Sequence, residues 1–368
     1  MDLSPTRKPT QRLHDLGQSL WLDNIDRKLL ESGGLKRYID KFSVTGLTSN
    51  PTIFDKAIGD SKAYDNAIRQ GASAAKSTEA LFFDLALQDL VEAARLFRSA
   101  FEASHSIDGW VSLEVSPLLA EDTKATVKAA IELHGRVSEP NLFIKIPGTP
   151  AGVPAIEEAI FKGIPVNVTL LFSLEQYLAA AEAYQRGIQR RIEAGLDPRV
   201  HSVASLFVSR WDTAVAKEAP KELLNRLGIA VSQQVYQAYC EVHATARWRK
   251  LSSSGAPKQK LLWASTGTKD PQASDTLYME ALAAPDTIST VPEKTLQAFA
   301  DHGKLRGVLP QDGGDSKTVL SAFTQAGVDI HALAERLQRE GTEAFAKSWH
   351  ELMQRVAEKA KALKASAA

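Results

Sequence analysis

A lysine inside an apolar segment is the first residue of this sequence whose surroundings suggest chemistry. Residues 141–147 are mostly apolar, partly β-branched and closed by Pro147 and Gly148, which predicts a short strand with Lys145 at its centre. Side chains alternate along a strand, so Phe143 and Lys145 share one face. If that face is buried, desolvation favours the uncharged amine, which is a nucleophile toward carbonyls and can form a Schiff base. An edge strand whose lysine faces water is the alternative.

Two carboxylates occur in other predicted strands. Asp23 ends the predicted strand 19–23, and Glu114 lies within the predicted strand 110–115. A lysine nucleophile needs an acid to dehydrate the carbinolamine and a base to take a hydroxyl proton, and these two residues supply both groups. Taken alone, Asp23 could instead cap a helix and Glu114 could be exposed on its strand.

Polar residues recur in or just after most of the remaining predicted strands. Arg and hydroxyl donors suit phosphate, so the group Ser205, Arg210, Ser265 and Lys269 predicts a local anion site. Each of these polar residues could instead have a purely structural role, for example in a turn or as a small packing residue. For all of them to be structural, polar residues would have to fall by coincidence on nearly every strand. The other residues of this kind are Asn50, Asn167 and Thr169.

Eight short apolar segments, most of them followed by a helical stretch, must position these residues. Strands that alternate with helices predict a parallel sheet, and eight units favour a closed (β/α)8 TIM barrel of the α/β class over an open doubly wound sheet. Active sites of such barrels lie at the carboxyl ends of the strands, often with phosphate at the last ones. The predicted strands are residues 19–23, 45–50, 110–115, 141–147, 164–171, 202–208, 260–265 and 287–291, and the clearest helices are 77–104, 123–137, 173–194 and 231–249.

The two ends of the chain lack this alternation of strands and helices. Residues 1–12 contain two prolines and several basic residues, which predicts a flexible N-terminal arm, and residues 13–368 then form a single barrel domain. A helical extension is expected from about residue 316, after a glycine-rich loop at 311–316. Residues 329–364 are predicted to form two amphipathic helices broken near Gly341, which pack over the barrel.

Composition narrows the class of protein. The 368 residues are 44% hydrophobic and 24% charged, as in ordinary soluble proteins. Lys and Arg (44) balance Asp and Glu (44), so no net charge favours nucleic acid or a membrane. One cysteine fits a reducing compartment, and no apolar run is long enough to span a bilayer, so we expect a cytoplasmic protein. The eight histidines lack metal-ligand spacing, so we expect no metal site.

Seven short motifs in these segments match the motifs of one known family, three of them more specifically than the other four. The chain resembles transaldolase of the longer bacterial type, a class I (Schiff-base) aldol enzyme, in order from about residue 14 to at least residue 300. The strongest motifs are Thr45-Gly-Leu-Thr-Ser-Asn-Pro51, Leu142-Phe-Ile-Lys-Ile-Pro147 and Asn167-Val-Thr-Leu-Leu-Phe-Ser173. The supporting ones are Ser19-Leu-Trp-Leu-Asp23, Val111-Ser-Leu-Glu-Val115, Ser205-Leu-Phe-Val-Ser-Arg210 and Trp263-Ala-Ser-Thr-Gly-Thr-Lys269.

The resemblance implies a role for each matched catalytic residue. Lys145 would form the Schiff base with a ketose donor. Asp23 would take the proton of the C4 hydroxyl as the C3–C4 bond breaks. Glu114, with a water held by Thr169, would shuttle protons as the imine forms and is hydrolysed.

It also implies how the substrate is held. Asn50 and Asn167 would hydrogen-bond the hydroxyls of the dihydroxyacetone unit, and Ser205, Arg210 and Ser265 would hold the phosphate. The best-known transaldolases carry an Arg two residues past the serine that corresponds to Ser265, whereas this sequence has Gly267 there. Lys269 is the candidate replacement for that second phosphate cation.

The implied activity needs no cofactor. A dihydroxyacetone unit would pass from sedoheptulose 7-phosphate or fructose 6-phosphate to glyceraldehyde 3-phosphate or erythrose 4-phosphate, in the pentose phosphate pathway. The expected partners are sugar phosphates, not nucleic acid or a membrane, and the expected assembly is a monomer or homodimer. Two alternatives stay open, a fructose-6-phosphate aldolase that releases free dihydroxyacetone and a non-catalytic sugar-phosphate-binding barrel.

Overall fold

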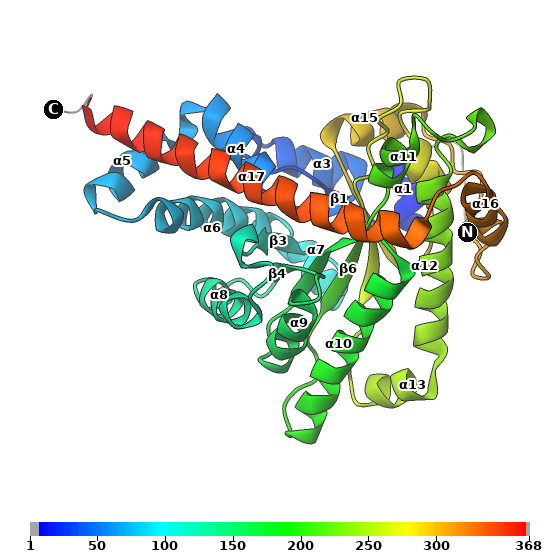
Figure 1. The fold of residues 1–368 in the computed structure, drawn as a ribbon. Coiled ribbons are helices and arrows are strands. Elements are labelled where there is room, and N and C mark those ends of the chain that lie inside the picture. Colours follow the sequence, from blue (N-terminus) through cyan, green and yellow to red (C-terminus); the bar gives the residue numbers. More distant parts are fainter. Residues whose placement is uncertain (1–6, 366–368) are drawn as a thin grey trace.

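The strands close into a barrel. The computed structural model describes residues 7–365. Eight strands pair in chain order, every pair is parallel, and β1 pairs with β8 to complete the ring, which confirms the predicted (β/α)8 TIM barrel (Figure 1). The strands are β1 (Ser19–Leu22), β2 (Val44–Thr48), β3 (Val111–Glu114), β4 (Leu142–Pro147), β5 (Val166–Leu171), β6 (Ser202–Phe207), β7 (Lys260–Ala264) and β8 (Thr287–Val291).

Helices surround the barrel, and their first residues follow from capping chemistry. Ser173, predicted as the cap of the helix after β5, forms a capping box with Gln176. The helices before β5 are α1 (Pro9–Asp15), α2 (Arg27–Glu31), α3 (Gly34–Phe42), α4 (Pro51–Asp60), α5 (Asp65–Ser73), α6 (Thr78–Leu96), α7 (Arg98–Ala103), α8 (Thr123–Gly135) and α9 (Gly152–Phe161). After β5 come α10 (Leu174–Glu193), α11 (Ser209–Val215), α12 (Leu227–Ala244), α13 (Ala246–Ser253), α14 (Leu277–Ala281), α15 (Glu293–His302), α16 (Ser316–Gln325) and α17 (Ile330–Ala365).

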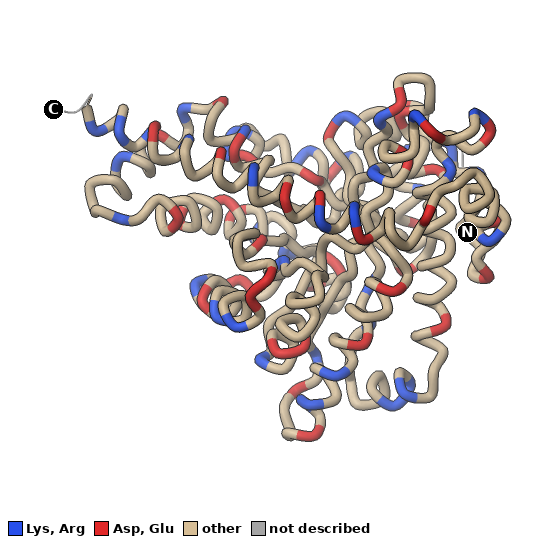
Figure 2. The backbone as a smooth tube through the Cα atoms, in the orientation of Figure 1, with Lys and Arg blue, Asp and Glu red and all other residues tan. Residues whose placement is uncertain are grey.

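Strand register places the polar residues of neighbouring strands side by side. Glu114 on β3 is level with Lys145 on β4, and Lys145 is level with Asn167 on β5. All six residues of β4 are buried, so Lys145 does not lie on an exposed edge strand. Charged residues of both signs are interspersed over the outer helices, in keeping with the zero net charge (Figure 2).

Two predicted segments differ in the structure. The stretch 77–104 is interrupted at Phe97, so α6 and α7 are separate helices. Part of the predicted N-terminal arm is helical, because α1 begins at Pro9, a residue suited to the first turn of a helix. Residues 1–6 of that arm lie outside the described residues.

The predicted break near Gly341 is wrong, because α17 is one continuous helix of 36 residues. The glycine allows a close crossing instead. A Cβ at this position would lie 3.0 Å from Cδ2 of Leu170 and 3.6 Å from Nη1 of Arg210, so the helix passes close to the end of β5 and the start of α11. Figure 1 shows α17 running across the barrel and on along α4, α5 and α6.

Aromatic and polar contacts fix α17 to the rest of the molecule. The Trp349 ring lies 5.2 Å from the Phe82 ring and 5.6 Å from the Phe83 ring of α6, between ring centroids. Nearer the barrel, the buried Gln338 donates from Nε2 to the backbone oxygens of Gly148 and Leu170, at 3.0 Å each. This amide therefore satisfies carbonyl groups at the ends of two strands.

We expect Gln338→Leu to lower the free energy of unfolding by about 1–3 kcal/mol, because two buried carbonyl groups lose their donor. Urea titration followed by circular dichroism measures the change. Gln354→Leu is the matched control, since that exposed glutamine on the same helix bonds only to Glu358. Equal stability of the two variants would contradict the anchoring role of Gln338.

Candidate active site

A cavity of about 320 Å³ opens at the carboxyl ends of the strands. The sequence analysis predicted ten site residues, and the structure brings eight of them to the wall of this cavity; Glu114 and Asn167 are buried and do not line it. The eight are Asp23, Asn50, Lys145, Thr169, Ser205, Arg210, Ser265 and Lys269.

Lys145 lies at the base of the cavity. It is 5% exposed, its Nζ lies 3.5 Å from Oε2 of Glu114, and it donates to the backbone oxygen of Ser49 at 3.2 Å. The ring of Phe345 on α17 is centred 5.9 Å from the same nitrogen. Phe143, on the same face of β4, instead stacks on Trp110 with ring centroids 4.1 Å apart. The amine therefore has a carboxylate beside it and an apolar ring above it.

Both carboxyl groups hold their protons more strongly than usual. Burial raises the pKa of Glu114 to about 7, and the charge of Asp23 adds to the rise, whereas Lys145 opposes it. Burial also raises the pKa of Asp23, against the opposing effects of Lys145, a hydrogen bond from Thr48 and Lys269. That hydrogen bond runs from Oγ1 of Thr48 to Oδ1 of Asp23 at 2.9 Å. Glu114 is thus suited to give and take protons near neutral pH.

Two buried oxygens at the site have unused hydrogen-bonding capacity. In the part of the chain that the structure describes, neither Oε2 of Glu114 nor Oγ1 of Thr169 makes a hydrogen bond. Buried polar groups are normally satisfied, so these two atoms mark places where a water or a substrate hydroxyl can bind.

The two predicted asparagines are placed differently. Asn50 caps α4, because its Oδ1 accepts from the backbone nitrogen of Ile53 at 3.1 Å, and it also lines the cavity. Asn167 is fully buried below it, where its Nδ2 donates to Ser112 at 3.1 Å and its Oδ1 accepts from Ser205 at 2.7 Å. Asn50 therefore faces the cavity, whereas Asn167 orients Ser205.

Cations and hydroxyls gather on the other side of the cavity. Within residues 7–365, Arg210 and Lys269 form no hydrogen bond or ion pair, so both charges are available to an anion. Ser265 has φ 56, a left-handed backbone that is unusual for a non-glycine residue, and its Oγ lies 2.8 Å from Oγ of Ser209.

Gly267 and Lys269 occupy adjoining space. A Cβ built on Gly267 would lie 3.9 Å from Nζ of Lys269. The ammonium of Lys269 is therefore close to where a side chain at position 267 would begin. Lys269 also acts electrostatically on Asp23. This placement supports the prediction that Lys269 supplies a cation at this corner of the cavity.

Sequence reasoning missed several residues of the cavity wall. Thr48 lies two residues before Asn50, and strand alternation could have identified it. Lys56 lies on α4, and Phe345 lies far along the chain on α17, so strand periodicity gives no signal for either. Lys56 forms no hydrogen bond or ion pair among the described residues, which adds a third unpaired cation to the cavity.

Residues 7–365 contain neither a candidate metal-binding cluster nor a candidate membrane-spanning helix. No cluster of three or more His, Cys, Asp or Glu side chains is arranged so that it could hold a metal ion. None of the described helices is both long and apolar enough to cross a bilayer.

Comparisons with known proteins agree on one family. The family model described as Transaldolase/Fructose-6-phosphate aldolase matches residues 20–356. A protein named Transaldolase from Thermobifida fusca is 45% identical, over 95% of this chain and 98% of its own length. One of the same name from Saccharopolyspora erythraea is 43% identical, over 96% and 98%. Transaldolase 2 of Streptomyces avermitilis is 42% identical, over 93% and 95%.

We expect Glu114 to titrate at a pH of about 7, and Lys145→Met to move that titration to higher pH, because the variant removes the opposing cation. Infrared difference spectroscopy of the carboxyl stretch measures the titration, with Glu114→Gln used to assign the band. A titration that stays in place in Lys145→Met would contradict the coupling of the two groups.

Proposed function

Because this chain belongs to the transaldolase/fructose-6-phosphate aldolase family, we propose that it is a transaldolase whose Schiff base forms on Lys145. It moves a dihydroxyacetone unit from a ketose phosphate, sedoheptulose 7-phosphate or fructose 6-phosphate, to an aldose phosphate, glyceraldehyde 3-phosphate or erythrose 4-phosphate. The observation that carries the proposal is that Nζ of Lys145, which lines the cavity, lies 3.5 Å from Oε2 of the buried Glu114, while the other wall holds cations without a partner among residues 7–365.

The first stage joins donor and enzyme. A proton shift from Lys145 to Glu114 leaves a neutral amine beside a protonated carboxyl, and the amine nitrogen attacks the C2 carbonyl of the donor. Glu114 then protonates the hydroxyl of the carbinolamine, water leaves, and the nitrogen lone pair forms the C=N bond. Thr169, whose Oγ1 has no partner among the described residues, holds a water that relays the proton.

The second stage breaks and remakes a carbon–carbon bond. Asp23 takes the proton of the C4 hydroxyl, the C3–C4 bond breaks, and its electrons pass to the iminium to give an enamine, while the aldose phosphate leaves. The enamine carbon then attacks the aldehyde of the acceptor, and Asp23 returns the proton to the new hydroxyl. Hydrolysis reverses the first stage and frees Lys145.

The remaining residues hold the substrate. Asn50 and Asn167 hydrogen-bond the hydroxyls of the dihydroxyacetone unit, and Asn167 also accepts a hydrogen bond from Ser205. Ser205, Arg210, Ser265 and Lys269 bind the phosphate, which a planar guanidinium and hydroxyl donors suit. We further propose a cytoplasmic enzyme, monomeric or homodimeric, without a cofactor; the single cysteine supports a reducing compartment.

Borohydride trapping tests the Schiff base. With fructose 6-phosphate present, we expect reduction to add a dihydroxyacetone-derived group to one residue, Lys145, because this lysine lies beside Glu114, which can accept its proton. Mass spectrometry of the intact and digested protein locates the adduct. Lys145→Met should yield none, and an adduct formed at full yield in that variant would overturn the assignment. Lys56→Met, which changes another lysine of the same cavity, is the control that keeps the adduct.

Incubation with fructose 6-phosphate alone separates the transferase from the aldolase. A transaldolase holds the enamine until an acceptor arrives, so we expect free dihydroxyacetone to remain below one equivalent per enzyme. Addition of erythrose 4-phosphate should then produce sedoheptulose 7-phosphate over many turnovers. Many turnovers of free dihydroxyacetone would instead support the aldolase, and no reaction in either assay would support a non-catalytic barrel.

Lys269→Ala should raise the KM for fructose 6-phosphate about tenfold or more, because a charge-assisted bond to the phosphate is worth about 1.5–3 kcal/mol. Gly267→Arg in the same protein should recover much of that loss, since an arginine there would extend into the space that the lysine leaves. Steady-state kinetics measures both effects. A Lys269→Ala variant with unchanged KM would remove this residue from the phosphate site.

A further inference from the structure

A second, larger cavity lies at the end of the barrel opposite Lys145. It holds about 760 Å³, within the range of small-molecule sites. Most of the residues that line it begin strands or precede them, among them Pro140 before β4, Pro165 before β5 and Pro257 before β7. This cavity is therefore separate from the proposed active site, which occupies the carboxyl ends of the same strands.

One cation in this cavity has no counter-charge. Lys260 starts β7 and is 8% exposed, yet within the described part of the chain it makes no hydrogen bond or ion pair. It shares the inward face of the strand with Leu262 and Ala264, two and four residues on, which line the other cavity. The side chain is therefore largely buried, while its ammonium keeps no partner among residues 7–365 and can bind an anion that enters the cavity.

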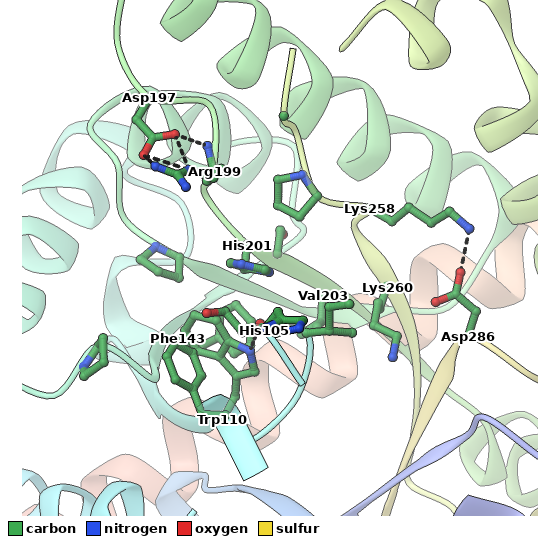
Figure 3. Close-up of a pocket in the computed structure, with 18 residues that line it drawn as sticks. His105, Trp110, Phe143, Asp197, Arg199, His201, Val203, Lys258, Lys260 and Asp286 are labelled. Carbon is green, nitrogen blue, oxygen red and sulfur yellow. Dashed lines mark hydrogen bonds and ion pairs between the residues drawn. The ribbon is translucent and has the colours of Figure 1, made fainter. Parts of the chain in front are cut away.

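The other charges of the lining neutralise each other. Nζ of Lys258 lies 2.7 Å from Oδ2 of Asp286, and Nη2 of Arg199 lies 2.9 Å from Oδ2 of Asp197. Figure 3 shows these two ion pairs at different edges of the pocket, with Lys260 next to Val203 between them. The lining therefore presents a single unmatched positive charge.

The rest of the wall is mainly apolar and aromatic, although His105, Ser106 and Ser202 also line it, and Ser202 is already hydrogen-bonded to Val166 and Gln259. Trp110 stacks on Phe143 and lies 5.2 Å from His201, between ring centroids, while the Phe101 ring packs on its edge at 5.1 Å. Burial lowers the pKa of His201 to about 4, so this ring is neutral at physiological pH. Ile107, 53% exposed, extends the apolar wall to the rim.

We propose that this cavity binds a small aromatic carboxylate, with its ring against the wall of Trp110, His201 and Ile107 and its carboxylate on Nζ of Lys260. The single unmatched cation suits a monoanion better than a phosphate dianion. An aromatic wall suits a flat ring better than a sugar, whose hydroxyls would need hydrogen-bond partners here.

Calorimetric titration with 2-naphthoate tests the proposal, and the neutral analogue 2-naphthalenemethanol isolates the charge. We expect naphthoate to bind, Lys260→Met to weaken it about tenfold or more, and Lys260→Arg to retain most of the affinity. Binding of the neutral analogue should be the same in all three proteins. No detectable naphthoate binding, or equal affinity in Lys260→Met, would overturn the proposal.

Two controls keep this result separate from folding and from the active site. Ile107→Glu should weaken naphthoate binding by repulsion at the rim, whereas Ile131→Glu, on a residue 45% exposed on α8, should not. Lys145→Met should bind naphthoate as the unmodified protein does, and fructose 6-phosphate should not compete. Competition by fructose 6-phosphate, or loss of binding in Lys145→Met, would place naphthoate at the other end of the barrel and overturn the proposal.

Discussion

Lys145 is tolerated inside the barrel because carboxyl groups lie close to it. An unpaired charge in a low-dielectric interior is costly, and removal of one member of a buried pair leaves the other uncompensated. Glu114 on the neighbouring strand and Asp23 just after β1 both interact electrostatically with the lysine, and the backbone oxygen of Ser49 accepts its hydrogen bond. The closed barrel holds these strands in register, so the groups cannot separate to reach water. The same confinement keeps the pKa of Glu114 near neutrality.

The substrate-binding groups depend on different elements from those that carry the chemistry. Lys145 and Glu114 belong to strands, whereas Arg210 lies on α11 and Lys269 follows β7 in a loop. Rigid strands suit groups that must be positioned precisely against the reacting atoms. Loops at the rim tolerate substitution, so their cations can differ while the strand residues stay in place.

Strand periodicity accounts for what the sequence could predict. Eight short apolar segments with inward polar residues were recognisable, and the carboxyl ends of parallel strands had to converge, so eight of the ten predicted residues line one cavity. Asn167 shows the limit of this reasoning, because alternation assigns it the inward face but does not show that its amide is buried against Ser112 and Ser205. Lys56 and Phe345 belong to helices whose approach to the cavity is set by tertiary packing. Gly341 was misjudged for the same reason, since propensity alone cannot tell a helix break from a close crossing.

The position of α17 in the chain has a consequence for how the protein is made. The ribosome synthesises the chain from the N-terminus, and a domain generally folds as a unit once its elements are available. Residues of β1 to β8 are all translated before Gln338 and Phe345, which complete the cover of the cavity. A nascent chain can therefore close its barrel and bury Lys145 before the ring above the amine has been synthesised. The active site is therefore completed late in translation, after the strands that support it have been synthesised.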